Sequence, residues 1–277
     1  MVDLLSTQLT NLARLCAWLA LLTLVFVPVE RLFSLHPSQY WRRDTARDVG
    51  YYFLNSLAPN LLLILPTAVL AWGLHGLMPD AWMKGVAGLP LWARLFLVLV
   101  VVEVGTYWGH RWSHEVPWLW RFHAVHHNPE HIHFLSNTRA HPLDMVFTRL
   151  CGLAPVYVLG LVGMSGNAGV DLAPMLVVVF GTVWGFFIHA NVRWRLGPLE
   201  WLVATPAFHH WHHTNDEWRD HNYAALFPWL DRLFGTHHLP NHWPPSYGID
   251  EPLPPGMGAQ LAHPFKPGAN PAPAPAE

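Results

Sequence analysis

Five apolar segments, each close to the length that crosses a lipid bilayer, constrain this chain more than any other feature. They cover residues 12–29, 49–72, 91–108, 145–164 and 174–190. About 20 mostly apolar residues span the hydrocarbon core as a helix, which satisfies its backbone hydrogen bonds internally. We therefore expect an all-α, polytopic membrane protein with about four to five transmembrane helices.

The composition agrees with a membrane location. Hydrophobic residues make up 52% of the chain and charged residues 12%, which is about half of the usual charged share. Sixteen tryptophans suit membrane–water interfaces. The formal net charge of −2 argues against a nucleic-acid partner, because phosphate binding requires a basic surface.

Arginine residues predict the orientation of these segments. Four arginines lie in residues 30–48, and others lie in the histidine-rich stretch and after the last segment, whereas Lys84 stands almost alone on the opposite side. By the positive-inside rule, the histidine-rich loops face the cytoplasm. The connector 164–173 lacks lysine and arginine and suits a helical hairpin.

Residues 1–250 are expected to form one integral-membrane domain with a helical, histidine-rich cap on the cytoplasmic face. The histidine-rich core covers about residues 95–240. Residues 251–277 are rich in proline and alanine, so we expect this tail to be disordered.

Histidines are gathered in two places, at spacings that suit a metal site. An H-x-x-x-H pair at His110/His114 and two H-x-x-H-H motifs occur among 20 histidines in 277 residues, and chance would give roughly 0.1 copies of H-x-x-H-H. Helical spacings of three or four place side chains about 5–6 Å apart on one face. Imidazole binds zinc, iron, copper and nickel. The motifs are His110/His114, His123/His126/His127 and His209/His212/His213.

The number of histidines exceeds the requirement of a single ion. A structural zinc takes four protein ligands and a catalytic zinc takes three, so eight histidines fit two ions with four or five nitrogens each. His189, at the end of the last apolar segment, is the ninth candidate. His141 is left open between a ligand and a residue that orients a ligand. Glu115, directly after His114, is the one carboxylate placed for either role.

Two familiar metal signatures are missing or incomplete in the sequence. It contains no H-E-x-x-H, the zinc protease motif. The carboxylate di-iron bundles need two Glu-x-x-His motifs, and only Glu130-His131-Ile132-His133 matches, once. The predicted metal site is thus rich in histidine and poor in carboxylate.

Taken together, the motifs resemble the fatty acid hydroxylase / sterol desaturase superfamily of membrane histidine-box oxidoreductases. The resemblance covers roughly residues 95–240. It extends beyond the histidines to Tyr107-Trp-x-His110-Arg, Leu119-Trp-Arg-Phe-His123, Arg139-x-His141-Pro142, His189-Ala-Asn191, Asn222-Tyr223 and Trp229-x-Asp231-Arg. Ala224, where the family often has glycine, is a small departure from the pattern.

The resemblance implies a non-haem di-iron centre, with two iron ions that use O₂ and external electrons to hydroxylate or desaturate a lipid. Fatty acyl chains, sterols, carotenoids and ether lipids are the implied substrates, and a separate ferredoxin, cytochrome or reductase is the expected donor. Three residues are candidates to orient ligands or assist catalysis: Glu115, Asn222 and Asp231. The implied ligands are His110, His114, His123, His126, His127, His189, His209, His212 and His213.

Two other functions compete with this interpretation. A zinc-dependent membrane-bound lipid hydrolase could use the same histidines without an electron supply. A metal transporter would carry ligands near the middle of the bilayer, where the apolar segments have almost no polar groups. For the oxidoreductase, we expect a lipid to enter laterally between the helices.

Overall fold

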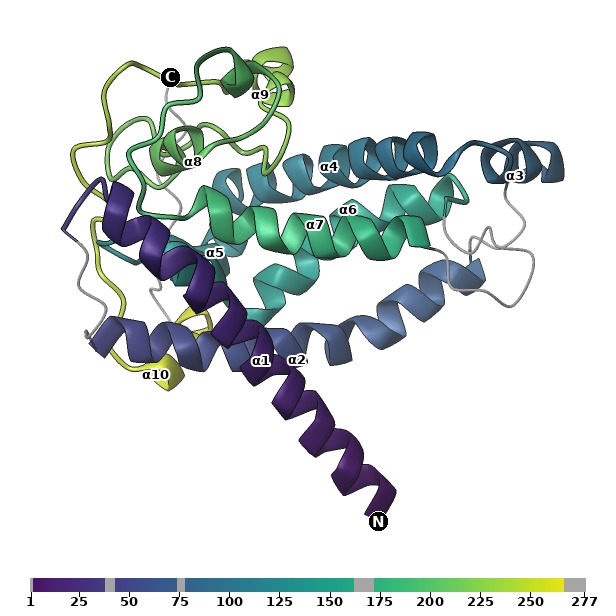
Figure 1. Ribbon diagram of the computed structural model, residues 1–277, viewed down its shortest axis with the longest axis horizontal. Coiled ribbons are helices and arrows are strands. Elements are labelled where there is room, and N and C mark those ends of the chain that lie inside the picture. The colour runs from purple at the N-terminus through teal and green to yellow at the C-terminus, as the bar shows by residue number, and fades with distance from the viewer. Residues whose placement is uncertain (1, 38–42, 74–77, 162–171, 267–277) are drawn as a thin grey trace.

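The computed structural model describes residues 2–37, 43–73, 78–161 and 172–266, which form helices joined by loops (Figure 1). Within these ranges β-structure is limited to two isolated bridges, Ser34 to Val192 and Thr214 to Tyr247. The predicted all-α class is confirmed.

Three helices are long and apolar enough to cross a membrane: α1 (Val2–Phe33), α2 (Arg43–Gly73) and α4 (Leu91–Glu115). The last two expected segments form α6 (Pro142–Val158) and α7 (Leu172–Ile188), which have 17 residues each. The apolar part of α7, Met175–Ile188, is shorter than a full span. The connector between α6 and α7, predicted to close a hairpin, falls almost wholly on residues 162–171, outside the described residues.

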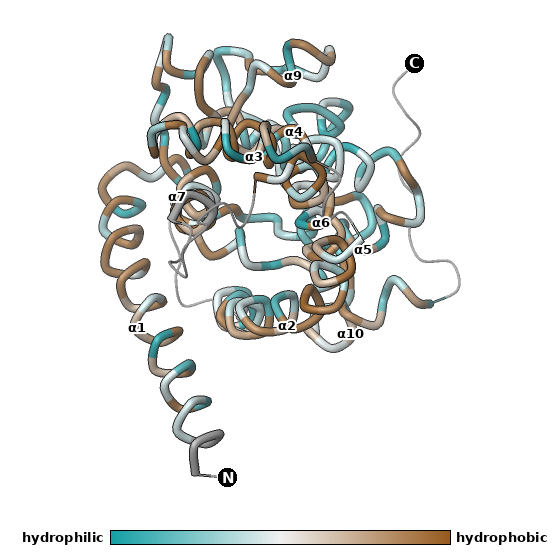
Figure 2. Tube along the Cα trace, turned by 90° about the vertical axis from the view of Figure 1, so that its right-hand side faces the viewer, coloured by the Kyte–Doolittle hydropathy of each residue, from teal (hydrophilic) through white to brown (hydrophobic). Residues whose placement is uncertain are grey.

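Helix α4 packs against α5, α6 and α7. Its contact with α6 is close because small residues face each other. A Cβ atom on Gly105 would lie 2.1 Å from the backbone oxygen of Cys151, and one on Gly109 would lie 2.8 Å from the Cys151 Cβ. Small residues let membrane helices approach in this way. In an end view, α1 lies to one side of the group formed by α2, α4, α6 and α7 (Figure 2).

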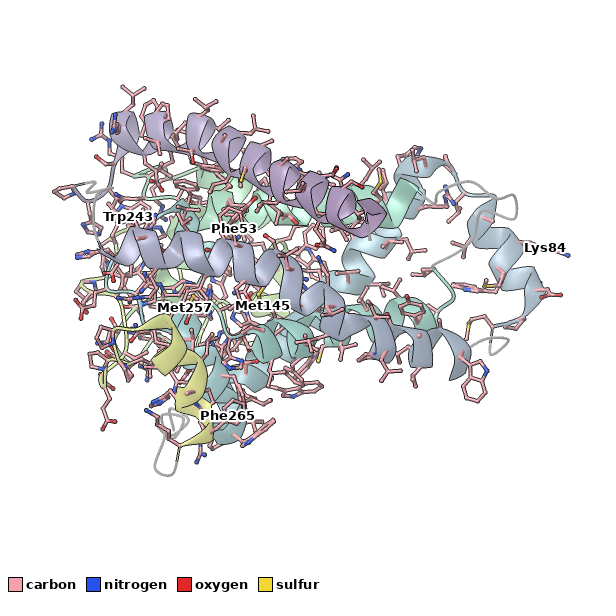
Figure 3. The ribbon with its side chains drawn as sticks, turned by 90° about the horizontal axis from the view of Figure 1, so that it is seen from below. Phe53, Lys84, Met145, Trp243, Met257 and Phe265 are labelled. Atoms are coloured by element: carbon pink, nitrogen blue, oxygen red, sulfur yellow. The ribbon has the colours of Figure 1, made fainter. Side chains whose placement is uncertain are left out.

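Short helices gather at one end of this bundle. They are α5 (Pro117–His127), η1 (Phe134–Thr138), η2 (Gly197–Trp201), α8 (Pro206–His212) and α9 (Trp229–Phe234). Helix α3 (Asp80–Ala87) lies at the opposite end (Figure 1). Lys84 of α3 is accordingly far from Trp243, which belongs to the end with the short helices (Figure 3).

Buried acidic side chains of α1 and α2 hold the loops at this end. Glu30 accepts hydrogen bonds from the backbone N–H groups of Phe134 and Asn191. Asp48 accepts from Arg139 and from the His133 ring. Burying a charge is costly unless it is paired and hydrogen-bonded, so these carboxylates fix the loops to the two long helices.

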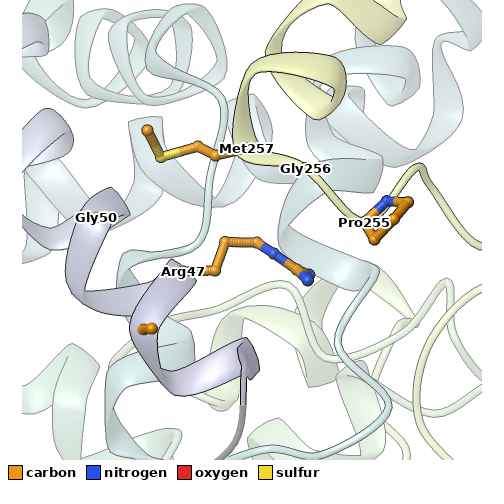
Figure 4. A pocket seen from close by; sticks show the side chains of 6 residues that line it. Arg47, Gly50, Pro255, Gly256 and Met257 are labelled. Atoms are coloured by element: carbon orange, nitrogen blue, oxygen red, sulfur yellow. The ribbon is translucent and has the colours of Figure 1, made fainter.

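The segment after Glu251 differs from the expected disorder as far as residue 266. It forms α10 (Met257–Ala262) and η3 (His263–Phe265). Tyr51 of α2 donates a hydrogen bond to the buried Gln260, and Met257 lies against Gly50 beside a hollow formed with Arg47, Pro255 and Gly256 (Figure 4). The composition of this segment could not predict that single residues within it pack against α2. The last residues of the tail, 267–277, lie outside the described part of the chain.

Candidate metal centre

Two groups of histidines converge at the end of the bundle that carries the short helices. In each group, one potential ligand atom per residue lies within 4.8 Å of all the others. The five-histidine set is His110, His114, His123, His127 and His212, and the four-histidine set is His126, His189, His209 and His213. The two sets contain the eight histidines of the sequence motifs together with His189, the ninth candidate.

Four helices deliver these histidines. The last turns of α4 and α5 carry the first two motifs, and His189 directly follows α7. Helix α8 carries the third motif; Pro206 begins it, and the Thr205 hydroxyl accepts from the Phe208 N–H. Serine or threonine before a helix and proline at its first position are common start signals. The i, i+4 pairs of each motif enter the same set, whereas His126/His127 and His212/His213 divide between the sets.

Ring nitrogens in the five-histidine set face each other without a proton to share. His110 Nδ1 donates to the Tyr223 carbonyl at 2.7 Å, and His123 Nδ1 lies 3.0 Å from Asp144. A carbonyl or a carboxylate only accepts, so each Nδ1 carries the proton and each Nε2 carries a lone pair. The two Nε2 atoms are 3.2 Å apart. Two facing lone pairs repel each other, and a cation between them removes this repulsion.

The four-histidine set repeats this arrangement. His126 Nδ1 donates to the Arg139 carbonyl at 3.0 Å, and His189 Nδ1 donates to the Gly185 carbonyl at 2.8 Å. The Nε2 atoms of these two rings are 3.3 Å apart, and His209 Nε2 lies 3.0 Å from His189 Nε2. The donors therefore fit a bound metal ion in this set as well.

Burial favours the neutral form of several of these imidazoles. It lowers the pKa of His126 to about 4, with the neighbouring His123 as a further cause. Burial also lowers the pKa of His127, His212 and His213 well below the usual value, and nearby histidines add to the effect. A neutral ring offers the free electron pair that a metal ligand needs, so the site is prepared for a cation near neutral pH.

Glu115 does not contact the histidines, contrary to the expectation from the sequence. Its carboxylate accepts a hydrogen bond from Arg111 at 2.6 Å and is largely exposed. Neighbouring residues on a helix do not face the same side, so Glu115 is turned away from the face that carries His114. In the described hydrogen bonds Glu115 binds Arg111 and none of the ligand histidines.

Asn222 and Asp231 are buried but touch no ligand histidine directly among the described contacts. The Asn222 amide donates to the Phe208 and His238 carbonyls, and its backbone has a left-handed φ of 60°. Asp231 accepts from the backbone N–H groups of Tyr223 and Ala224. Both residues fix the loop whose Tyr223 carbonyl accepts from His110, so their link to the site is indirect.

His141, which the sequence left undecided, belongs to neither set. It caps the start of α6 by accepting from the Leu143 N–H, and its Nε2 donates to the Leu261 carbonyl in α10. The residue joins α6 to the tail helix.

Two carboxylates that the sequence motifs did not reveal orient histidines directly. Asp144 Oδ2 lies 3.0 Å from His123 Nδ1, and Asp220 Oδ1 lies 2.9 Å from His114 Nδ1. Carboxylates commonly bind the outer nitrogen of metal-ligating histidines. Each is far in sequence from the histidine it contacts, and neither spacing forms a motif. The only sequence signal was that Asp144 directly follows His141-Pro142-Leu143 at a helix start.

Comparisons with known proteins agree with this site. The fatty acid hydroxylase family matches residues 95–236, about half of the chain. Ornithine lipid hydroxylase OlsE of Rhizobium tropici is 36% identical over 194 residues, which cover 68% of this chain and 53% of that protein. Alkylglycerol monooxygenase of Danio rerio is 31% identical over 262 residues, covering 80% and 55%.

A plant desaturase is also similar. Delta(7)-sterol-C5(6)-desaturase of Nicotiana tabacum is 30% identical over 148 residues, covering 50% of this chain and 48% of that protein. The chain spans about half of the length of the hydroxylase and the monooxygenase. No solved structure matches it at a significant level.

Proposed function

Because the chain belongs to the fatty acid hydroxylase family, we propose that it is an O₂-dependent di-iron oxidoreductase that hydroxylates or desaturates a membrane lipid. The observation that carries the proposal is the convergence of nine buried or largely buried histidines into two sets, in each of which two Nε2 atoms with lone pairs face one another at 3.2–3.3 Å. Such donors require cations, and two sets provide for two ions.

Bound iron would supply the O₂ activation that an unreactive C–H bond needs. For hydroxylation, R–H, O₂, two electrons and two protons give R–OH and H₂O. The nine Nε2 atoms of the two sets would hold the ions. The outward Nδ1–H groups, hydrogen-bonded to Tyr223, Arg139 and Gly185, would keep the rings in place. Burial of the rings limits the access of water to the reacting carbon.

A lipid substrate fits the position of the site. The histidines lie at the ends of α4 and α7, so a lipid between the apolar helices would present its chain to them laterally. The similar proteins are named for ornithine lipid, alkylglycerol and sterol chemistry, all of which concerns membrane lipids. We propose a substrate of this class, with electrons from a separate ferredoxin, cytochrome or reductase.

We also propose that the protein is multi-pass, with the histidine sets on the cytoplasmic face. Arg139 follows η1 and binds Asp48, the neighbour of Arg47, and Arg195 binds Glu200 of η2, so all three arginines belong to the end with the short helices. Lys84 belongs to the opposite end (Figure 3). Residues 1–250 and the helical tail to residue 266 would form one domain, since α10 packs on α2.

Purified protein tests this function directly. We expect about two iron ions per chain and a lipid product that forms only with O₂ and a reductant. The zinc hydrolase alternative predicts zinc at the same histidines and turnover without oxygen. Lipid conversion that persists anaerobically in zinc-loaded protein would refute the oxidoreductase. Comparing the lipids of cells with and without the chain would identify the substrate.

A further inference from the structure

The two histidine sets differ in what holds their outer nitrogens. In the five-histidine set, Asp220 lies 2.9 Å from His114 Nδ1 and Asp144 lies 3.0 Å from His123 Nδ1. The outer nitrogens of His110 and His212 donate to backbone carbonyls, those of Tyr223 and His221. The Nδ1 of the fifth ring, His127, is buried without a hydrogen-bond partner in the described part of the chain. Two of the five rings are therefore supported by carboxylates.

The four-histidine set has no such support among the described residues. Its His126 and His189 donate to the carbonyls of Arg139 and Gly185. The Nδ1 atoms of His209 and His213 are buried without a hydrogen-bond partner in the described part of the chain. No carboxylate hydrogen-bonds to any of its four rings in the described part of the chain. Asp144 acts on His126 only through its charge.

This difference has a direct effect on metal binding. A carboxylate that accepts from Nδ1–H makes the imidazole a stronger base at Nε2, and it fixes the ring orientation. It also places negative charge near the bound cation. A carbonyl acceptor raises the basicity of Nε2 and fixes the ring more weakly than a carboxylate does. A histidine whose Nδ1 has no partner gains neither effect. The five-histidine set also offers one more nitrogen.

We propose that the two sites are unequal, with Asp144 and Asp220 as positioning residues that make the five-histidine set the tighter metal site. The four-histidine set then loses its ion first. The inference rests on the proposed function only in that both sets bind iron.

Asp144 should contribute more than Asp220, because it is held more firmly. It lies in the first turn of α6 and is buried, and its other oxygen accepts from Ser113 of α4 at 3.2 Å. Asp220 lies in a loop and keeps 25% of its side chain exposed. Water therefore competes for the Asp220 carboxylate, while Asp144 is locked between two helices.

Stepwise removal of iron from the full-length protein tests the inequality. Under a graded chelator challenge, wild-type protein should release two ions in two separate steps. Asp144→Asn should weaken the tighter step by about 10–100-fold and bring the two steps together, and Asp220→Asn should give a smaller change. Glu103→Gln is the matched control, because Glu103 is a buried carboxylate that accepts only from backbone N–H groups in the described contacts.

Mössbauer spectroscopy of ⁵⁷Fe-loaded protein gives a second readout, which a general loss of stability would not produce. We expect two quadrupole doublets of equal area, with only one shifted in Asp144→Asn and the same one shifted in Asp220→Asn. His209→Ala should remove the other doublet. Asp220→Asn, in an exposed loop, keeps the test valid if Asp144→Asn does not fold.

Several results would overturn the inference. Release of both ions in one step from wild-type protein would do so, as would equal shifts of both doublets in either aspartate variant. In those cases the iron content would still support the proposed function. Wild-type protein that binds no iron at all would instead refute both.

Discussion

At the scale of single residues, the division of labour between ring nitrogens is what makes this end of the molecule a metal site. In His126 and His189, the protonated Nδ1 donates to a backbone carbonyl outside the site, and the lone pair of Nε2 points toward the other histidines. The motifs predicted candidate ligands but not this polarity, because the partners are carbonyls that any residue type supplies.

Replacing one histidine of a set should remove function without removing the protein. His126→Ala or His213→Ala deletes one of four nitrogens in the same set. We therefore expect product formation to fall by about 100-fold, the upper end of the cost of losing an outer partner of a metal ligand. One iron ion should be lost, with unchanged membrane content. Metal analysis, lipid turnover and immunoblotting of membranes measure this. His242→Ala is the control, since the exposed His242 lies outside both sets. Turnover at the wild-type rate in either variant would contradict the assignment.

The metal-free protein should lose stability on acidification. The pKa of His126 is lowered to about 4 by burial, whereas an unfolded histidine has a pKa of about 6.5. Between these values the unfolded chain binds more protons, so stability is full above pH 6.5 and is lost as the pH falls toward 4. Thermal unfolding in detergent at several pH values checks this. A melting temperature that rises between pH 6.5 and pH 4.5 would exclude it.

At the scale of elements, the site depends on how closely α4 and α6 approach, because α4 carries His110 and His114 while α6 carries Asp144. Gly105→Ala places a methyl group 2.1 Å from the Cys151 oxygen, so we expect a loss of about 1–3 kcal/mol and a reduced iron content. Gly181→Ala in α7 has nothing within 4 Å and should be neutral. Equal melting temperatures for the two variants would contradict the close contact.

The same elements show how far the sequence could be interpreted. Apolar length predicted α1, α2 and α4, because a span is a property of consecutive residues. It could not fix the shorter α6 and α7, nor see that Tyr51, Gln260 and His141 anchor the tail. Helical spacing predicted the candidate ligands but not how they divide between two sets, since it grouped His126 with His123 and His127. The sequence did not predict Asp144 and Asp220 as partners of His123 and His114, because only tertiary contacts bring these residues together. Glu115 was predicted because it is next to His114 in the sequence.

At the scale of the whole molecule, the histidine sets and Lys84 mark opposite ends (Figures 1 and 3). If the histidine end faces the cytoplasm, a cysteine introduced by Glu217→Cys should react with an impermeant thiol reagent only from that side. One introduced by Lys84→Cys should react only from outside. Both sites are exposed, and Cys16 and Cys151 would first be replaced by alanine. Labelling of both from one side would exclude the proposed topology.

The adjacent pairs His126-His127 and His212-His213 have a mechanical consequence. Each pair gives one ring to either set, so a single peptide unit, with Cα atoms about 3.8 Å apart, separates the two. Each pair therefore fixes the distance between the two sets through a covalent bond. A thinner bilayer or a warmer membrane can tilt the long helices, but it cannot stretch a peptide bond, and the spacing of the two ions would hold while the scaffold flexes.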